Sequence, residues 1–430
     1  MDLHEVIRPI WMYYYRMIQS NNDILDSSLT FPLVPQTHIE LLMKETANIL
    51  YNEPSLLRII GDVVVIGAIH GHILDLFRII KQFGSPEYTK YLFLGNFIDY
   101  GDFSTETAIL IFVLKYLYPN NVFIIRGKHE FAHICQRGTF SSELYAIYGN
   151  KMIQSAFLKA FAYLPFASLV NNKILCVHGG IGPNSNDIST IESIKRPIYD
   201  SESIVAKELI FSEPSDSISQ SIKSRNYLYT FGQKAVQAFM KNEKIDLIIR
   251  CKEIIEGGIE YGFNNSIASV CSASNFCGIY KNNSCVIKIK SNGQNEQVIL
   301  PPIAYVKRMK AVHLSRRISN ISSYPNTVPS VSGPVTTSRS CPNSNVSLVS
   351  SLKSSTKLPV LSSRIKECSN MSQKNVENSI IPNRKSMYGQ KNIGEVNHTF
   401  GMKKDFEFLG LKKITPSRLP GSKRSPSVWK

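Results

Sequence analysis

The amino-acid sequence predicts an α/β fold. Six short apolar runs rich in β-branched residues have the length of buried strands, and they lie at residues 62–67, 91–95, 122–126, 174–178, 246–250 and 283–289. Segments in which apolar side chains recur at helical spacing separate several of these runs. Because polar loops follow the strands, we expect ligand-binding residues at the carboxyl ends of the strands.

Two helices are predicted from local signals. Thr37 and Glu40 have the spacing of a capping box, which predicts a helix from Thr37 to about Leu50. Residues 104–118 repeat apolar side chains at helical spacing, namely Ile109, Leu110, Val113, Leu114 and Leu117. Residues 1–35, which are rich in aromatic side chains, predict a helical extension that packs on the core.

Glycine-containing motifs follow four of the predicted strands. They are Gly67-Ala68-Ile69-His70-Gly71, Gly95-Asn96-Phe97-Ile98-Asp99-Tyr100-Gly101, Gly127-Lys128-His129-Glu130 and His178-Gly179-Gly180. In this order they resemble the blocks G-D-x-H-G, G-D-x-V-D-R-G, G-N-H-E and H-G-G of the phosphoprotein phosphatase family, the type 1, 2A and calcineurin-like Ser/Thr phosphatases. Ser212-Glu213-Pro214 and Arg250-Cys251-Lys252 resemble the later blocks S-D-P and R-A-H. The resemblance covers roughly residues 36–302 and implies a calcineurin-like metallophosphoesterase fold, a central two-sheet β-sandwich flanked by helices.

The resemblance also implies six side chains that hold two divalent metals, Mn, Fe or Zn. The matching positions in this chain are Ala68, His70, Asn96, Lys128, His178 and Lys252, so that only the two histidines remain as remnant metal ligands. Dinuclear sites of this kind depend on a bridging carboxylate for charge compensation, and none is left. An ammonium about 4 Å from a unit positive charge is repelled by roughly 4 kcal/mol at an effective dielectric near 20. We therefore expect no metal cofactor.

Other positions of the family's catalytic machinery are partly kept. Asp99 and His129 match its acid pair, which we expect to be idle because a metal-activated water is missing. Arg225 matches one arginine that clamps the phosphate, and Tyr100 stands at the other clamping position. Lys128, Lys252 and Arg225 are predicted to converge on one phosphate-binding pocket. The alternative is that these cations are solvated or paired internally and bind nothing.

These features favour a pseudophosphatase, a catalytically impaired family member that serves as a scaffold or binds a phosphoprotein or other protein partner. The alternative is an active or weakly active metal-dependent phosphatase that hydrolyses phosphoserine and phosphothreonine. Type 1 enzymes also bind Val-x-Phe motifs in an apolar groove, which Ile174, Leu247 and Tyr261 would line. The strand expected to close that groove, residues 293–297, is polar, so we do not expect the standard regulatory subunits to bind.

The basic charge lies in the C-terminal segment. Residues 303–430 contain 22 Lys and Arg against 5 Asp and Glu, a net +17, whereas residues 1–302 carry a net −1. The segment is rich in serine and poor in aromatic residues, which predicts a disordered tail from about residue 305. We expect three parts, an N-terminal extension (1–35), a phosphatase-like domain (36–302) and the tail (303–430). A third reading makes the tail the functional part, through attraction to acidic surfaces, RNA or anionic lipid.

The eight cysteines contain no C-x-x-C pair, and several lie within apolar strand-like runs. The sequence shows no secretory h-region and no apolar stretch of about 18 residues that would predict a membrane span. These observations predict a reducing intracellular compartment, cytoplasmic or nuclear.

Overall fold

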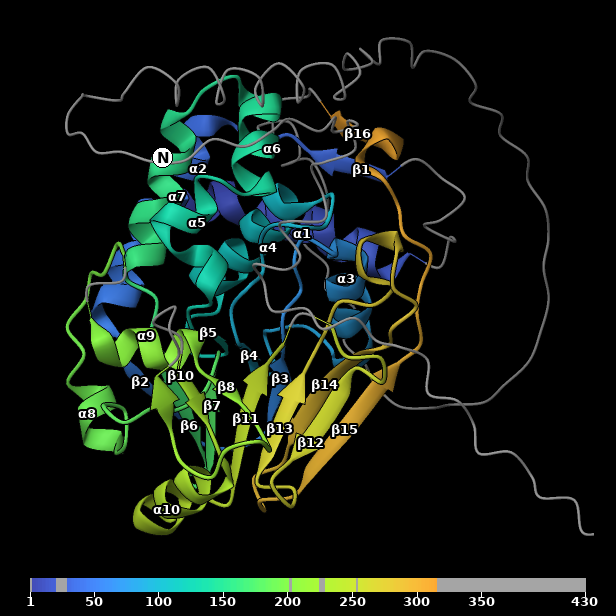
Figure 1. Cartoon of the computed structure of the whole chain (residues 1–430). Helices are drawn as coiled ribbons and strands as arrows, with labels where there is room; N and C mark the ends of the chain where they lie inside the picture. Colours follow the sequence, from blue (N-terminus) through green and yellow to red (C-terminus); the bar gives the residue numbers. More distant parts are fainter. Residues whose placement is uncertain (1, 21–28, 201–202, 224–228, 253, 315–430) are drawn as a thin grey trace, which may run out of the picture. The chain divides into compact units, whose positions relative to one another are not determined.

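The computed structural model describes residues 2–20, 29–200, 203–223, 229–252 and 254–314 of the 430-residue chain. Two β-sheets pack face to face in the lower half of Figure 1, and most helices of the N-terminal half lie above them. Arg225 and residues 315–430, which make up most of the predicted tail, lie outside the described residues. Within the described part, no helix is both long and apolar enough to cross a bilayer.

The first sheet has six strands in the order β12-β13-β11-β7-β6-β2. Their bounds are β2 Leu56–Ile59, β6 Ala167–Val170, β7 Ile174–Val177, β11 Leu247–Cys251, β12 Ile259–Gly262 and β13 Ile267–Val270. The neighbours β7, β11 and β13 run parallel, so their carboxyl ends meet at one edge of the sheet. Hydrogen bonds also join β8 (Glu213–Pro214), β9 (Ile222–Lys223) and β10 (Tyr229–Phe231) in a small separate sheet.

The second sheet has five strands in the order β15-β14-β3-β4-β5. Their bounds are β3 Val63–Ile66, β4 Tyr91–Phe93, β5 Val122–Ile124, β14 Ser284–Ile289 and β15 Asn295–Leu300. The neighbours β3, β4 and β5 are parallel, and β14 joins them antiparallel. All six strands predicted from apolar runs are present, each within a few residues of its expected bounds.

Three clusters of buried apolar side chains hold the two sheets and the covering helices together. Between the two sheets, one cluster combines inward side chains of both, such as Val65, Ile287, Ile249 and Val270. The outer face of the six-stranded sheet is covered by α8 (Ile188–Glu192), α9 (Ile204–Phe211) and α10 (Gln233–Glu243). The outer face of the five-stranded sheet is covered by helices of the N-terminal half. The predicted two-sheet sandwich flanked by helices is therefore confirmed.

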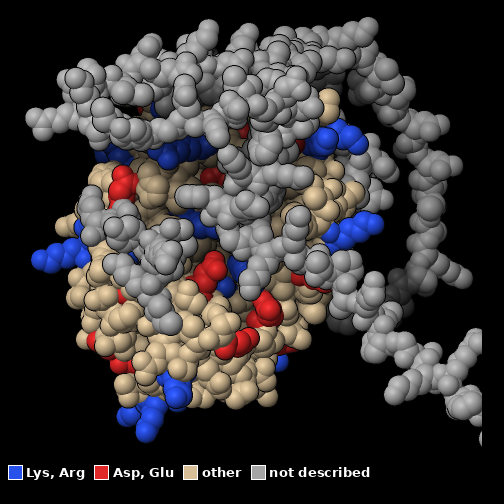
Figure 2. Space-filling view, in the orientation of Figure 1, with Lys and Arg blue, Asp and Glu red and all other residues tan. Residues whose placement is uncertain are grey.

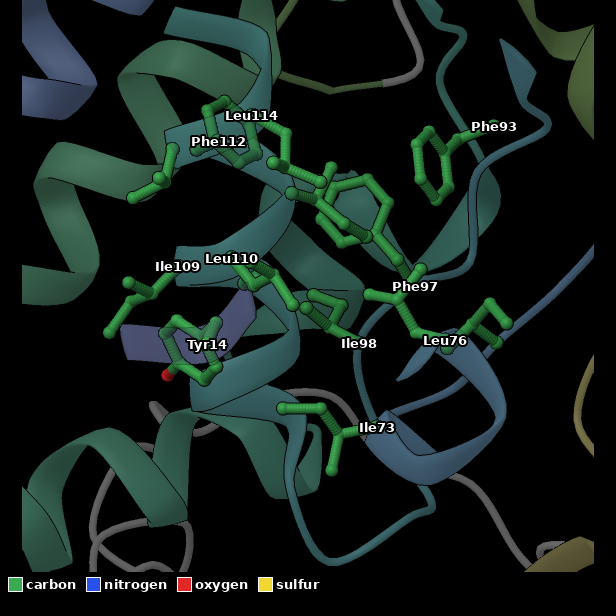
Figure 3. Packing of buried hydrophobic residues seen from close by; sticks show 14 of the residues in the cluster. Tyr14, Ile73, Leu76, Phe93, Phe97, Ile98, Ile109, Leu110, Phe112 and Leu114 are labelled. Atoms are coloured by element: carbon green, nitrogen blue, oxygen red, sulfur yellow. The ribbon is translucent and has the colours of Figure 1, made fainter. Parts of the chain in front are cut away.

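The helices on the five-stranded sheet come from the first 162 residues. They are α1 Leu3–Gln19, α2 Gln36–Asn52, α3 Ile73–Phe83, α4 Ser104–Leu117, α5 Ala132–Cys135, α6 Thr139–Tyr148 and α7 Met152–Ala162. The helix α4 is buried on almost every side from Ser104 to Lys115, in keeping with its apolar sequence. Figure 3 shows Leu110 and Phe112 of this helix packed among Tyr14 of α1 and Phe97 and Ile98 of the loop after β4.

The start of α2 differs from the prediction. Pro35 occupies the N-cap, no side chain caps the helix, and the side chain of Glu40 accepts a hydrogen bond from Gln36 at 2.7 Å. The capping box expected at Thr37 is therefore wrong. Proline is well suited to the start of a helix because it has no backbone N–H to leave unsatisfied.

The N-terminal extension packs on the core as predicted, whereas the C-terminal boundary differs from the prediction. The aromatic side chains Trp11 and Tyr14 of α1 are buried in the cluster that covers the five-stranded sheet. Beyond residue 302, the chain forms a short 3₁₀ helix, η3 (Arg308–Lys310), and the strand β16 (Ala311–Leu314). This strand pairs in parallel with β1 (Leu29–Pro32), so the prediction of disorder from about residue 305 is wrong for residues 305–314.

Candidate functional site

The predicted site residues lie in loops at the carboxyl ends of parallel strands, as expected. Ala68 and His70 follow β3, Asn96 and Asp99 follow β4, and Lys128 and His129 form the short 3₁₀ helix η1 (Lys128–Glu130) after β5. His178 follows β7, and Lys252 follows β11. His70, Asn96, Asp99 and Tyr100 all have positive φ, between 45° and 69°. Non-glycine residues held in this region are typical of functional sites.

Glu130 fixes two of these loops to each other. Its buried carboxylate accepts hydrogen bonds from the backbone N–H groups of Asn96 (3.0 Å), Phe97 (3.1 Å) and Gly127 (2.9 Å). Burial raises the pKa of this carboxyl to about 7, and the three backbone donors oppose that shift. At Gly95, a side chain would place its Cβ only 2.2 Å from the backbone nitrogen of Gly127, so the close approach of the loops requires glycine there. The motif contained Glu130, but nothing in the sequence indicated this positioning role.

The pair Asp99–His129 is formed. The Nδ1–H of His129 donates to Asp99 Oδ2 at 2.7 Å, and Asp99 Oδ1 accepts from the backbone N–H of Phe140 at 2.8 Å. Burial lowers the pKa of His129, with the bond to Asp99 opposing that shift. The other ring nitrogen, Nε2, is buried and has no hydrogen-bond partner among the described residues. An imidazole in this state presents a lone pair at Nε2.

The two remnant metal ligands are buried and anchored by backbone carbonyls. His70 donates from Nδ1 to the carbonyl of Ile98 at 2.9 Å, and His178 donates from Nδ1 to the carbonyl of Leu94 at 2.7 Å. Burial is the largest cause that lowers both pKa values, to about 3 for His178 and well below the ordinary range for His70. Both rings are therefore neutral at pH 7, and their Nδ1 atoms are not available as ligands.

The side chains at the other positions that match the family's metal ligands are not suitable metal donors. Ala68 is fully buried and forms a β-bridge with Cys271. Asn96 uses its side-chain oxygen to accept from the backbone N–H of His129 at 3.1 Å, and its amide nitrogen lies 3.4 Å from His70 Nε2. No three His, Cys, Asp or Glu side chains are grouped so that they could hold a metal, in the part of the chain that the structure describes. The residues present therefore do not fit a dinuclear metal centre.

Lys128 acts on the site histidines: after burial, its charge contributes to the lowered pKa of His70, His129 and His178. Burial lowers its pKa to about 8, with Glu213 as the largest opposing influence, and Arg250 lowers it further. Arg250 is itself 5% exposed; its side chain donates from Nε to the carbonyl of Gly179 and contacts Ser269 Oγ at 3.3 Å. Glu213 and Arg250 were part of recognised motifs, but the sequence did not indicate that both act on Lys128.

Lys252 is placed differently from the expectation, and its neighbour Cys251 contacts a site histidine. The Lys252 side chain is 47% exposed and its Nζ lies 3.3 Å from Glu260 Oε2 on β12, so it is a surface ion pair. Cys251, which replaces the family's alanine, brings its Sγ to 3.0 Å from His178 Nδ1. The predicted convergence of Lys128, Lys252 and Arg225 is therefore not seen for Lys252, and Arg225 lies outside the described residues.

Figure 2 shows acidic and basic side chains interspersed on the face drawn.

Aromatic rings surround the histidines of the site. The ring of Tyr100 lies 4.8 Å from that of His70 and 5.1 Å from that of His129, measured between centroids. Phe276 lies 5.5 Å from His70 and 5.6 Å from Tyr100. Tyr100 thus packs against imidazole rings at the position where the family resemblance places a phosphate-clamping arginine.

Comparisons with known proteins agree with this architecture. A sequence profile described as calcineurin-like phosphoesterase matches residues 61–250. The catalytic subunit of serine/threonine-protein phosphatase 4 from Candida glabrata is 30% identical over 287 residues, which cover 67% of this chain and 93% of that protein. Its Saccharomyces cerevisiae counterpart is 30% identical over 270 residues, covering 63% and 88% of the two chains.

A solved structure supports the same conclusion. A Saccharomyces cerevisiae protein serine/threonine phosphatase, described as similar to human phosphatase PP5, superimposes with a TM-score of 0.59 and 26% identity. The match covers 64% of this chain and 92% of the other. The chain belongs to the serine/threonine protein phosphatase family, within the calcineurin-like phosphoesterases.

Proposed function

We propose that this chain is a catalytically impaired member of its family, a pseudophosphatase that binds a phosphorylated residue of a protein partner without hydrolysing it. The proposal is supported by one observation: after burial, the charge of Lys128 contributes to the lowered pKa of His70 and His178, while Ala68 and Asn96 stand at the first and second carboxylate positions. A divalent ion about 4 Å from the Lys128 ammonium would be repelled by roughly 8 kcal/mol at an effective dielectric near 20. The reaction of the family depends on a water activated by such ions.

The ligand follows from the charge of Lys128. An ammonium and an anionic phosphate form charge-assisted hydrogen bonds, which contribute roughly 1.5 to 3 kcal/mol each. The family resemblance assigns Arg225 as a second donor. With two such donors, affinity for a phosphoserine peptide is expected in the range of about millimolar to tens of micromolar, once ordering costs are deducted. Lys252 has a minor part in this proposal, because phosphate would have to displace Glu260 from it.

A second candidate is a slow phosphoesterase, as considered from the sequence. It is favoured by one observation, the intact Asp99–His129 pair with Nε2 of His129 buried and without a partner among the described residues. A protonated His129 in this geometry could deliver a proton to a leaving oxygen. Burial opposes that protonated state, since it lowers the pKa of the ring.

Three measurements on purified full-length protein separate the candidates. Metal content is measured after incubation with manganese, hydrolysis of an aryl phosphate is followed in the same buffer, and phosphopeptide binding is measured by calorimetry in a chelator. The proposal expects no stoichiometric metal, no turnover, and binding of the phosphopeptide but not of its unphosphorylated twin. Stoichiometric manganese together with turnover that is lost in His178→Ala would instead establish the enzyme.

The C-terminal segment is proposed as an additional contact for an acidic surface, RNA or anionic lipid. This proposal is supported by the net +17 charge of residues 303–430. Its test is a comparison of the full chain with a chain ending at residue 314. We expect phosphopeptide binding to be equal in both, and binding to RNA or anionic vesicles to be lost on truncation. Retention of RNA and vesicle binding by the shorter chain would contradict the role of the tail.

A further inference from the structure

A pocket outside the site loops lies between the end of α2, the turn into β2 and the segment after α8. Its volume is about 230 Å³, and its lining includes Tyr51, Glu53, Ser55, Glu192, Ile194 and Arg196. Figure 1 shows β2 and α8 at the left edge of the view, on the six-stranded sheet. Ligand pockets for drug-sized molecules hold roughly 300 to 1,000 Å³. The size of this pocket therefore suits a single side chain rather than a whole small molecule.

The hydrogen-bond donors of Arg196 and Ser55 in the pocket are already used. The Arg196 guanidinium donates to the carbonyls of Leu50, Glu53 and Tyr163 and to Ser55 Oγ. The hydroxyl of Ser55 in turn donates to the carbonyl of Ile194 at 2.5 Å. An anionic ligand would have to break these bonds, so the pocket is not an anion site.

The acceptors, by contrast, have capacity left. Glu53 binds the ammonium of Lys115 through Oε1, while its Oε2 is buried and has no hydrogen-bond partner among the described residues. Burial raises the pKa of this carboxyl. Glu192 receives Arg58 on Oε1 at 2.6 Å, and its side chain is 40% exposed. A buried carboxylate oxygen without a donor is unfavourable, so a donor that reaches it through a small movement of the Glu53 side chain, which is 16% exposed, would relieve it.

An aromatic ring stands at the rim of the pocket. Tyr51 is 65% exposed, which is unusual for a large aromatic side chain, and its ring packs edge-to-face on Tyr163 with centroids 5.9 Å apart. This contact fixes the position of a ring that lines the pocket together with Glu53 and Glu192. A guanidinium stacks on aromatic rings and offers five donors in one plane, whereas a lysine ammonium is compact and strongly hydrated.

We propose that this pocket binds an arginine side chain of a partner protein. The guanidinium donates to Glu53 Oε2 and to Glu192, and it stacks on the ring of Tyr51. Because Lys115 and Arg58 already neutralise part of the two carboxylates, recognition depends on hydrogen-bond complementarity more than on net charge. The pocket shares no residue with the site loops, so this proposal is independent of the pseudophosphatase assignment.

Ligand-observed NMR on the full-length protein tests the chemistry, with N-acetyl-arginine amide as the probe. N-acetyl-citrulline amide has the same shape without the charge and with fewer donors, and N-acetyl-lysine amide keeps the charge without the planar group. We expect the arginine probe to bind at least tenfold more tightly than either of the others. Equal binding of the arginine and citrulline probes would overturn the proposal.

Variants locate the binding. Glu53→Gln is expected to weaken the arginine probe at least tenfold, and Tyr51→Ala and Glu192→Gln at least threefold each. The last two leave the pair of Glu53 and Lys115 in place, so they report on the pocket even if Glu53→Gln disturbs the fold. The matched control is Tyr88→Ala, because Tyr88 is 81% exposed and does not line the pocket. Unchanged affinity in Tyr51→Ala and Glu192→Gln, or an equal loss in Tyr88→Ala, would rule out this site.

Discussion

Arg308 and Glu106 form a buried, two-pronged ion pair. Both terminal nitrogens of the guanidinium lie 2.8 to 3.1 Å from the two carboxylate oxygens, and the side chains are 9% and 3% exposed. Glu106 also accepts from His313 Nε2 at 2.8 Å. Since Glu106 lies in the first turn of α4, directly after the loop that carries Asp99, the pair fastens residues 303–314 beside the candidate site.

The first prediction concerns this pair. Arg308→Ala would remove the cation that pairs with Glu106 and that also lies 3.8 Å from the buried carboxylate of Glu143. Removal of one partner of a buried pair typically costs about 3 to 5 kcal/mol. We expect the free energy of unfolding in urea to fall by this amount. Lys310→Ala, at an exposed position two residues away, is the control and should change it by less than about 0.5 kcal/mol. A loss below about 1 kcal/mol for Arg308→Ala would show that the pair is not important for stability.

The second prediction places the end of the folded part. A chain that ends at residue 314 keeps Arg308 and the pairing of β16 with β1, whereas a chain that ends at residue 302 loses both. We expect the longer of these to unfold at the same temperature as the full chain, and the shorter to unfold at a clearly lower temperature. Differential scanning calorimetry of the three proteins decides the matter. Equal stability of the two truncated chains would contradict the corrected boundary.

The third prediction reverses the metal-site replacements. Ala68→Asp, Asn96→Asp, Lys128→Asn and Lys252→His together restore the six ligand types that the family resemblance implies. We expect the quadruple variant to bind manganese and to gain weak activity on an aryl phosphate, limited by Tyr100 at the clamping position. The matched control keeps Lys128 and carries the other three changes, and its ammonium should prevent binding of the second ion. A folded quadruple variant that binds no manganese would show that these positions are misassigned.

The fourth prediction is a pH dependence of phosphopeptide binding. Burial lowers the pKa of Lys128 to about 8, so the ammonium is present below that pH and lost above it. Affinity should therefore be constant between pH 6.5 and 7.5, where the phosphate is dianionic, and fall by up to about tenfold for each pH unit above 8. Lys128→Arg, which stays charged, should move the fall to higher pH, and Lys128→Ala should abolish binding. Calorimetry across this range is the measurement; affinity that is flat to pH 9.5 would exclude Lys128 as the phosphate ligand.

Much of the fold and of the candidate site could be predicted from the sequence, because the information is local. The strands β3, β4 and β5 are continuous apolar runs, and each is followed at once by the motif that carries site residues. Parallel pairing then brings those loops to one edge, so Asp99 and His129 meet as expected. The sandwich itself followed from the family resemblance of these motifs.

The features that could not be predicted depend on contacts between distant parts of the chain. Lys252 stands at a ligand position, but its side chain pairs with Glu260 on β12, which lies two strands away from β11 in the sheet. Residues 305–314 look like the beginning of a polar tail, and they are ordered because Glu106 and β1 provide partners about 200 or more residues earlier in the chain. The amino-acid composition of this segment is that of a polar tail, and it does not indicate that one arginine, Arg308, is buried.

The hydrogen bonds of Glu130 have a consequence for how the site keeps its shape. In this chain one carboxylate joins the loops after β4 and β5 through three backbone N–H groups. These contacts are made by groups of the chain itself, which neither a chelator nor a change in trace-element supply can remove. If the protein has the function proposed above, the site keeps the same contour under metal starvation as under metal excess.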